Sequence, residues 1–221
     1  MKKVFLVIAL TSICVSQVLA ASSSFSFGKK EITNGIASGL STDSGYVVVS
    51  LGNSLADADL DNLNKFQFNV ISFYIPDEIN TPGTYKLEVF DQRAVSKDDD
   101  PCAASEPITS LPSTDRVYML ATVFRSIQGK NFTRVKGETA VSEDGVGTFT
   151  IDSTAQLGET TLLDIVGSYD IKMKTQKYVQ TAPNDEAVCD SENIPKKVKT
   201  KVAKKVRKKT STGSFNTGFT E

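Results

Sequence analysis

The chain has 221 residues, of which 39% are hydrophobic and 23% are charged, and its formal net charge at pH 7 is -1. It contains no histidine, which excludes the commonest general base, the commonest zinc ligand and the usual histidine partner of a serine or cysteine nucleophile. The near-neutral charge hides a division, because residues 21–195 hold 25 acids and 14 bases whereas residues 196–221 hold nine bases and one acid. An acidic body repels phosphate-rich polymers, so attraction to anions is expected to come from the C-terminal segment.

The first 20 residues have the layout of a secretory signal peptide. Lys2 and Lys3 precede an apolar run, which ends on Val18-Leu19-Ala20 before a cluster of serines. The alternative is a membrane anchor, but polar residues interrupt the run and it is short for a bilayer. We therefore predict cleavage after Ala20, export to the periplasm or the medium, and no transmembrane anchor in the mature protein.

The body from residue 21 to residue 195 is expected to be one all-β domain. Seven stretches rich in β-branched and aromatic residues are separated by turn-forming residues. In one of them Tyr85, Leu87 and Val89 alternate with polar residues, as in a strand with one dry face. We predict an antiparallel β-sandwich or a small barrel, and a short helix over residues 54–63. The predicted strands are residues 46–51, 66–75, 84–90, 117–124, 132–141, 147–152 and 162–173.

One acidic cluster resembles the start of a calcium loop. Asp57, Asp59 and Asp61 alternate as the first ligands of such a loop do, because alternate side chains can converge on one hard cation. The turn position holds Asn62 where glycine is needed, and the twelfth position holds Phe68 where a bidentate glutamate is needed. The sequence favours a solvated acidic face over a metal site and leaves calcium open; no cofactor is expected.

The mature chain would keep two cysteines, Cys102 and Cys189. An exported protein meets oxidising conditions, in which two thiols tend to pair. We predict a disulfide between them, which could stabilise the fold by about 4 kcal/mol in the chain-entropy model. Two unpaired thiols are the alternative.

The strings GTYKLEVF, GVGTFTIDST and IVGSYDIKM share short Gly-Thr-Tyr, Gly-Thr-x-x-Ile and Gly-x-Tyr patterns. Over residues 83–173 the chain resembles small secreted bacterial β-sandwich proteins, most of them uncharacterised. Those proteins are often lipoproteins, whereas this chain lacks a lipidation cysteine. The resemblance implies a β-sandwich fold and carries no functional residue.

The C-terminal segment from residue 196 to residue 221 is predicted to be a basic, flexible tail. Its valines alternate with lysines as in a strand but also recur every four residues as on a helix, so both structures stay open. Repulsion among the lysines favours order only on contact with an anionic partner; the alternatives are a tail that only aids solubility and a strand edge that its lysines guard against pairing. The residues predicted to bind anions are Lys196, Lys197, Lys199, Lys201, Lys204, Lys205, Arg207, Lys208 and Lys209.

These features predict a non-catalytic binding or structural protein of the envelope or the medium. Its basic tail would contact anionic lipid, envelope polysaccharide or nucleic acid. The alternative is a carboxylate-based hydrolase with a site built from loops, for which Asp164 and Asp170 are an example of a candidate pair. The oligomeric state is left open.

Overall fold

The computed structural model describes residues 21–53, 65–90, 108–128, 130, 132–141, 145–156, 162–183 and 199–218. Over these ranges the protein forms eleven β-strands and no helix, which confirms the predicted all-β class. All seven predicted strands are present, most of them longer than predicted. The strands are β1 (Ala21–Phe27), β2 (Lys30–Ser41), β3 (Tyr46–Asn53), β4 (Lys65–Pro76), β5 (Gly83–Val89), β6 (Arg116–Gln128), β7 (Phe132–Ala140), β8 (Val146–Gln156), β9 (Leu162–Pro183), β10 (Lys199–Val202) and β11 (Arg207–Asn216).

The strands form one mixed sheet whose hydrogen-bonded order runs β10-β9-β11-β1-β2-β3-β4-β6-β5-β8. All pairings are antiparallel except the one between β5 and β6, which is parallel. The long strands β6 and β9 are joined twice, once through β7 and once through β5 and β8. As a result, the pairings close on themselves: β9, β11, β1, β2, β3, β4, β6 and β7 lead back to β9.

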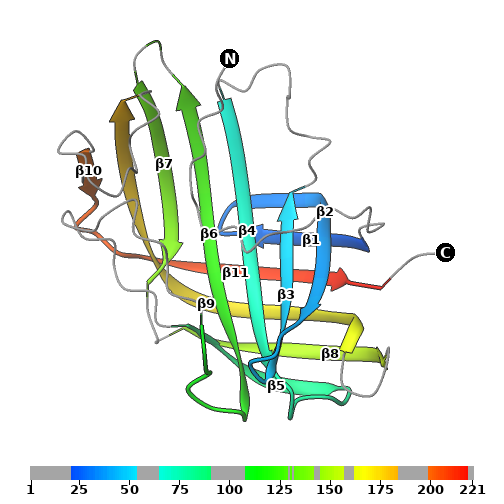
Figure 1. Cartoon of the computed structure of the whole chain (residues 1–221). Helices are drawn as coiled ribbons and strands as arrows, with labels where there is room; N and C mark the ends of the chain where they lie inside the picture. Colours follow the sequence, from blue (N-terminus) through cyan, green and yellow to red (C-terminus); the bar gives the residue numbers. More distant parts are fainter. Residues whose placement is uncertain are drawn as a thin grey trace.

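Figure 1 shows two sets of strands that cross one another. Strands β3, β4, β6 and β7 run along the length of the molecule, and β1, β8 and β11 lie across them. Strand β9 belongs to both sets, because it runs with β8 and β11 at first and then turns upward beside β7.

The hydrophobic core lies where the two sets cross. Phe73 of β4 is fully buried at its centre, with ring centroids 5.0 Å from Phe149, 4.8 Å from Tyr169 and 6.1 Å from Phe215. These distances suit tilted and stacked aromatic pairs, which add to the stabilisation from burial alone. Because Phe215 is a residue of β11, the C-terminal strand is part of this core.

The C-terminal segment differs from the flexible tail that the sequence predicts. Residues 199–202 form β10, and β11 is paired along its whole length with β9 and along part of it with β1. A complete row of backbone pairs with β9 and a partial row with β1 hold β11 in place, and these backbone hydrogen bonds do not depend on which side chains the strand carries. Within β11, Ser211 and Phe215 are buried, so this segment belongs to the same sheet as the body.

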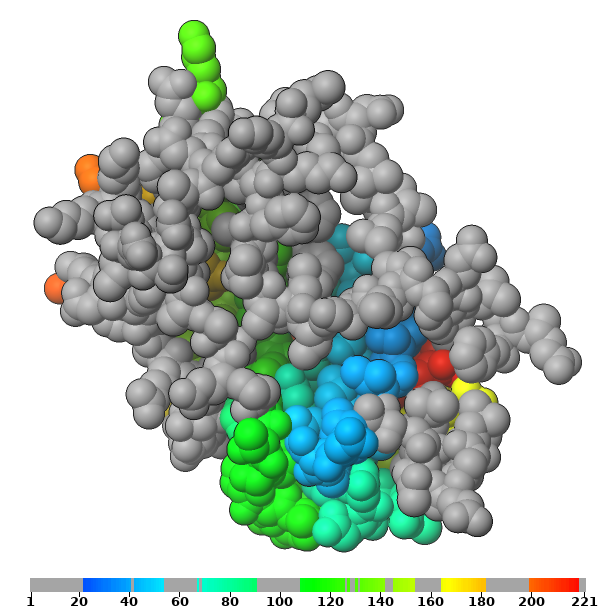
Figure 2. Space-filling view, viewed as in Figure 1, coloured from blue at the N-terminus to red at the C-terminus, as the bar shows by residue number. Residues whose placement is uncertain are grey.

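The predicted helix at residues 54–63 lies outside the described residues, as does the predicted signal peptide. The described part of the chain holds no helix with the length and hydropathy needed to cross a bilayer. At the end of the molecule where β5 lies, the chain segments around residues 42–45, 77–82 and 108–115 come to the surface in Figure 2. There the Tyr46 hydroxyl donates a hydrogen bond of 2.6 Å to the Ile108 carbonyl, which fastens the segment before β6 to β3.

Candidate anion-binding face

One face of the sheet changes from apolar to charged along β6, β7 and β9. In the lower half, alternate residues of β9 such as Ile171 and Met173 point into the core. Strand β9 pairs with β7 and β11 without a register shift beyond this point. Because side chains alternate strictly along a strand, the face that carries Met173 continues through Thr175 and Lys177 to Val179.

A row of cross-strand neighbours, polar except for Val123, marks the end of the core. Asn69 of β4 lies opposite Val123 of β6, and Val123 lies opposite Glu138 of β7. Glu138 in turn lies opposite Lys177 of β9. Asn69 is buried, and Val123 is partly buried and packs against the core. Beyond this row the same face carries basic side chains.

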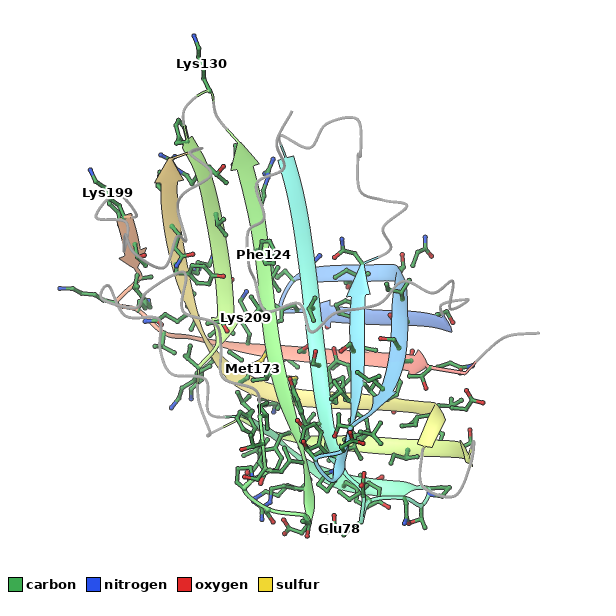
Figure 3. The ribbon with its side chains drawn as sticks, in the orientation of Figure 1. Glu78, Phe124, Lys130, Met173, Lys199 and Lys209 are labelled. Atoms are coloured by element: carbon green, nitrogen blue, oxygen red, sulfur yellow. The ribbon has the colours of Figure 1, made fainter. Side chains whose placement is uncertain are left out.

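We call this surface the basic face. It is built by β6, β7, β9, β10 and β11, so it includes residues from distant parts of the sequence. In Figure 3, Lys209 lies at its inner end beside Met173, and Lys199 lies at its outer end. All of its basic side chains are exposed except that of Lys209, which is half-buried. The basic face consists of Arg125, Arg134, Lys136, Lys177, Lys199, Lys201, Arg207 and Lys209.

On β6, β7 and the upper part of β9, the opposite face carries buried side chains. Phe124 of β6, Val135 and Thr139 of β7 and Gln176 of β9 are each less than a tenth exposed. This burial holds the upper part of the sheet in place, because the charged side chains of the basic face contribute little apolar area. Over β6, β7 and the upper part of β9, the basic face is therefore the exposed side of a sheet whose other side is buried.

Glu138 organises the inner end of the basic face. Its carboxylate accepts a hydrogen bond of 2.7 Å from Thr175 Oγ1, lies 2.9 Å from Lys209 Nζ and lies 3.9 Å from Lys177 Nζ. Lys209 Nζ also lies over the ring of Phe27, 5.0 Å from its centroid, a favourable cation–π geometry. Burial raises the pKa of Glu138, but the bonds from Thr175 and Lys209 and the charges of the two lysines outweigh it and hold that pKa below its usual value.

A second polar group lies on β2, β3 and β4, beside the same row. Lys30 Nζ donates a hydrogen bond of 2.6 Å to Asn69 Oδ1. The backbone N–H and the side-chain amide of Asn69 both donate to Asn53 Oδ1, at 2.8 and 3.0 Å. Burial lowers the pKa of Lys30. The group carries no acid, so it adds a further positive charge next to the basic face.

Negative charge on the basic face is scarce. Glu138 is the one acid on it among the residues that the structure describes, and its carboxylate is already occupied by Thr175 and Lys209. Arg125 and Lys136 stand directly opposite each other on β6 and β7, and like charges in such pairs destabilise a sheet. The arrangement favours binding of an anion, which would relieve this repulsion.

Four of the nine residues predicted to bind anions belong to the basic face. Lys199 and Lys201 project from β10, on the side of β9 that carries Thr181 and Val179. Arg207 and Lys209 project from β11, opposite Thr175 and Met173 of the core-side face. The sequence was compatible with either a strand or a helix here, and these four residues lie on strands.

The other five predicted residues are placed differently. Lys208 pairs with Lys174 and projects from the opposite face of β11. Lys204 and Lys205 lie exposed in the connection between β10 and β11. Lys196 and Lys197 lie outside the described residues.

Cys102 and Cys189 also fall outside the described ranges, so the disulfide stays a prediction. The same holds for the calcium hypothesis at residues 57–61. Asp164 and Asp170 both lie on β9, six positions apart, a separation of about 20 Å along a strand. Paired carboxylates of glycoside hydrolases lie no further than about 9.5 Å apart, so these two do not form such a site.

Arg125, Arg134, Lys136 and Lys177 were missed by the sequence reasoning. The signal for two of them was present, because Arg134 and Lys136 alternate with Val135 in a predicted strand. What the sequence could not supply is the register that brings β7 and β9 beside β6 and β10.

Within the described part of the chain, no group of three or more acidic or cysteine side chains is placed to hold a metal ion. No protein-family model matches the chain, and no curated protein or solved structure matches it either.

Proposed function

We propose that the protein is a non-catalytic binding protein and that its basic face holds an anionic partner. The observation that carries this proposal is the gathering of basic side chains from five strands onto one exposed face with a single acid among the described residues. Such a face creates a positive electrostatic potential near it, although the net charge of the whole molecule is close to zero. Its cost in repulsion, at Arg125 and Lys136 above all, is the kind of local conflict that proteins keep at functional sites.

The acidic character of the rest of the chain makes the proposal testable by ion exchange. The sequence pI is about 5.7, so at pH 8 the whole protein carries a net negative charge. A resin bearing phosphate groups would repel a molecule with evenly spread charge and retain one with a basic face. We expect retention at low salt and elution as salt is raised.

Two double variants separate the basic face from net charge. Lys199→Ala with Lys201→Ala removes two positive charges from the basic face, and Lys172→Ala with Lys208→Ala removes two exposed positive charges from the opposite side of the sheet. We expect the first pair to lower the salt concentration needed for elution and the second to leave it nearly unchanged. Equal behaviour of the two variants would refute the basic face as the binding surface.

Export is part of the same proposal, because the signal-like first 20 residues support it. The mass of the protein recovered from the cell envelope and the medium would test it, since cleavage after Ala20 predicts a chain that begins at Ala21. We also propose that the closed circuit of strand pairs makes the domain a small barrel, one of the two architectures expected from the sequence. The likeness to secreted bacterial β-sandwich proteins remains a hypothesis.

A further inference from the structure

The outer part of the basic face has a regular layout. Arg134 of β7 lies opposite Thr181 of β9, which lies opposite Lys199 of β10. In the next row Lys136 lies opposite Val179, which lies opposite Lys201. Two short lines of cations, one on β7 and one on β10, therefore flank an uncharged lane formed by Val179 and Thr181.

The dimensions of this layout follow from sheet geometry. Two strand spacings separate the cation lines, which is about 9.5 Å, and alternate residues within a line are about 6.7 Å apart. A single polymer chain fits between the two lines and can be contacted from both sides. The two phosphate backbones of a DNA duplex stand on either side of a major groove about 12 Å wide, which is wider than the spacing of the two cation lines. A bilayer presents a plane of charge, and an uncharged lane between cations gives no advantage in binding a plane.

An aromatic side chain stands at the end of the β7 line. Phe132 is 40% exposed, and the Arg134 guanidinium carbon lies 5.5 Å from the centroid of its ring. Phe132, Arg134 and Lys136 project from the same side of β7 because they are alternate residues. Exposed aromatic rings and guanidinium planes are the surfaces on which unpaired bases stack.

We propose that the lane binds single-stranded nucleic acid, with phosphates between the β7 and β10 cations and a base stacked at Phe132. An extended single strand carries one phosphate per nucleotide, so that several phosphates of one strand can lie along the lane between the two lines of cations. Lysine and arginine both bind phosphate well. This inference rests on the proposed anion-binding function and names its ligand class.

The test is fluorescence anisotropy with a labelled single-stranded oligonucleotide of mixed sequence. If four phosphates are neutralised, raising salt from about 50 to about 200 mM weakens binding by about 50-fold, since the slope for single strands is about -0.7 per phosphate. The Lys199→Ala, Lys201→Ala variant should bind more weakly at low salt and lose only about sevenfold over the same interval. The Lys172→Ala, Lys208→Ala variant should match the unsubstituted protein.

Phe132→Ala separates stacking from charge. We expect about tenfold weaker binding with an unchanged dependence on salt, because the ring contributes stacking and no charge. An unchanged affinity would overturn the stacking role and with it the assignment to nucleic acid. Circular dichroism on each variant verifies that the fold is retained, as expected for exposed positions.

Three further probes decide between the proposals. The same sequence as a duplex, polygalacturonate and phosphatidylglycerol vesicles should each compete less well than the single strand. Tighter binding of any of these probes would overturn the nucleic-acid inference and leave the proposed anion-binding function standing. Failure of every probe to bind would overturn both.

Discussion

Replacing Phe215 by alanine tests whether the C-terminal strand is a core element. Phe215 is 3% exposed, and its ring centroid lies 5.5 Å from that of Phe149 and 6.1 Å from that of Phe73. Truncation of a buried phenylalanine costs about 3–5 kcal/mol, and the loss of two aromatic contacts favours the upper part of this range. For a domain of this size the change lowers the melting temperature by roughly 10 °C.

The assay is urea unfolding followed by fluorescence or circular dichroism, with Phe132→Ala as the matched control. Phe132 is exposed and has one cation–π contact, with Arg134, so its loss should cost no more than about 1 kcal/mol. We expect the midpoint for Phe215→Ala to fall with little change in the slope against urea. Equal midpoints for the two variants would refute the placement of β11 in the core and restore the flexible tail.

Two other positions give predictions of different kinds. At Gly137 a Cβ atom would lie 2.0 Å from Tyr178 Cζ, so Gly137→Ala should lower the free energy of unfolding in urea by about 1–3 kcal/mol. At Gly52 the nearest atom to an added Cβ would be 3.6 Å away, so Gly52→Ala should change that free energy by no more than about 0.5 kcal/mol. Equal losses of stability for the two variants would contradict the packing around Gly137. The pKa of Glu138 is below its usual value, so its carboxylate contributes stability that is present above about pH 4.3 and is lost as pH falls through the folded-state pKa. Glu138→Gln should therefore lose less stability than the unsubstituted protein between about pH 5 and pH 3, and parallel curves would count against the cluster with Lys209.

The strands that were predicted from the sequence are those whose own residues have high β-propensity or alternate between apolar and polar. In β3 and β4 β-branched and aromatic residues follow one another, because these strands are buried in the core. Strands β1, β2 and β11 are rich in serine, glycine and threonine, which are typical of loops. At Gly213 the reason is packing, since a Cβ atom there would lie 2.7 Å from both Phe25 and Tyr169. Small residues in these strands make room for large ones on their neighbours.

The basic residues of the C-terminal segment were found from composition, but their role in the fold was not. Lysines favour water, so a dense run of them suggests a solvated tail. In β10 the lysines alternate with Thr200 and Val202, which are half-buried, and the strand satisfies both tendencies by placing them on opposite faces. The gathering of cations from β6, β7 and β9 onto this face could not be predicted, because only long-range strand pairing brings them together.

The seam between β1 and β11 joins the two ends of the described chain. The Ser26 hydroxyl of β1 donates to the Thr212 carbonyl of β11, 186 positions away. A ribosome therefore has to deliver almost the whole chain before the ring of strands can close, and until then β1 and β9 present open edges that can pair with other molecules. Because β1 and β11 are neighbours, the protein is also suited to circular permutation. A short linker would join the ends of these two strands, and new ends would be opened in the exposed turn between β2 and β3. Every strand pair would be kept, and only the covalent link between β2 and β3 would be lost.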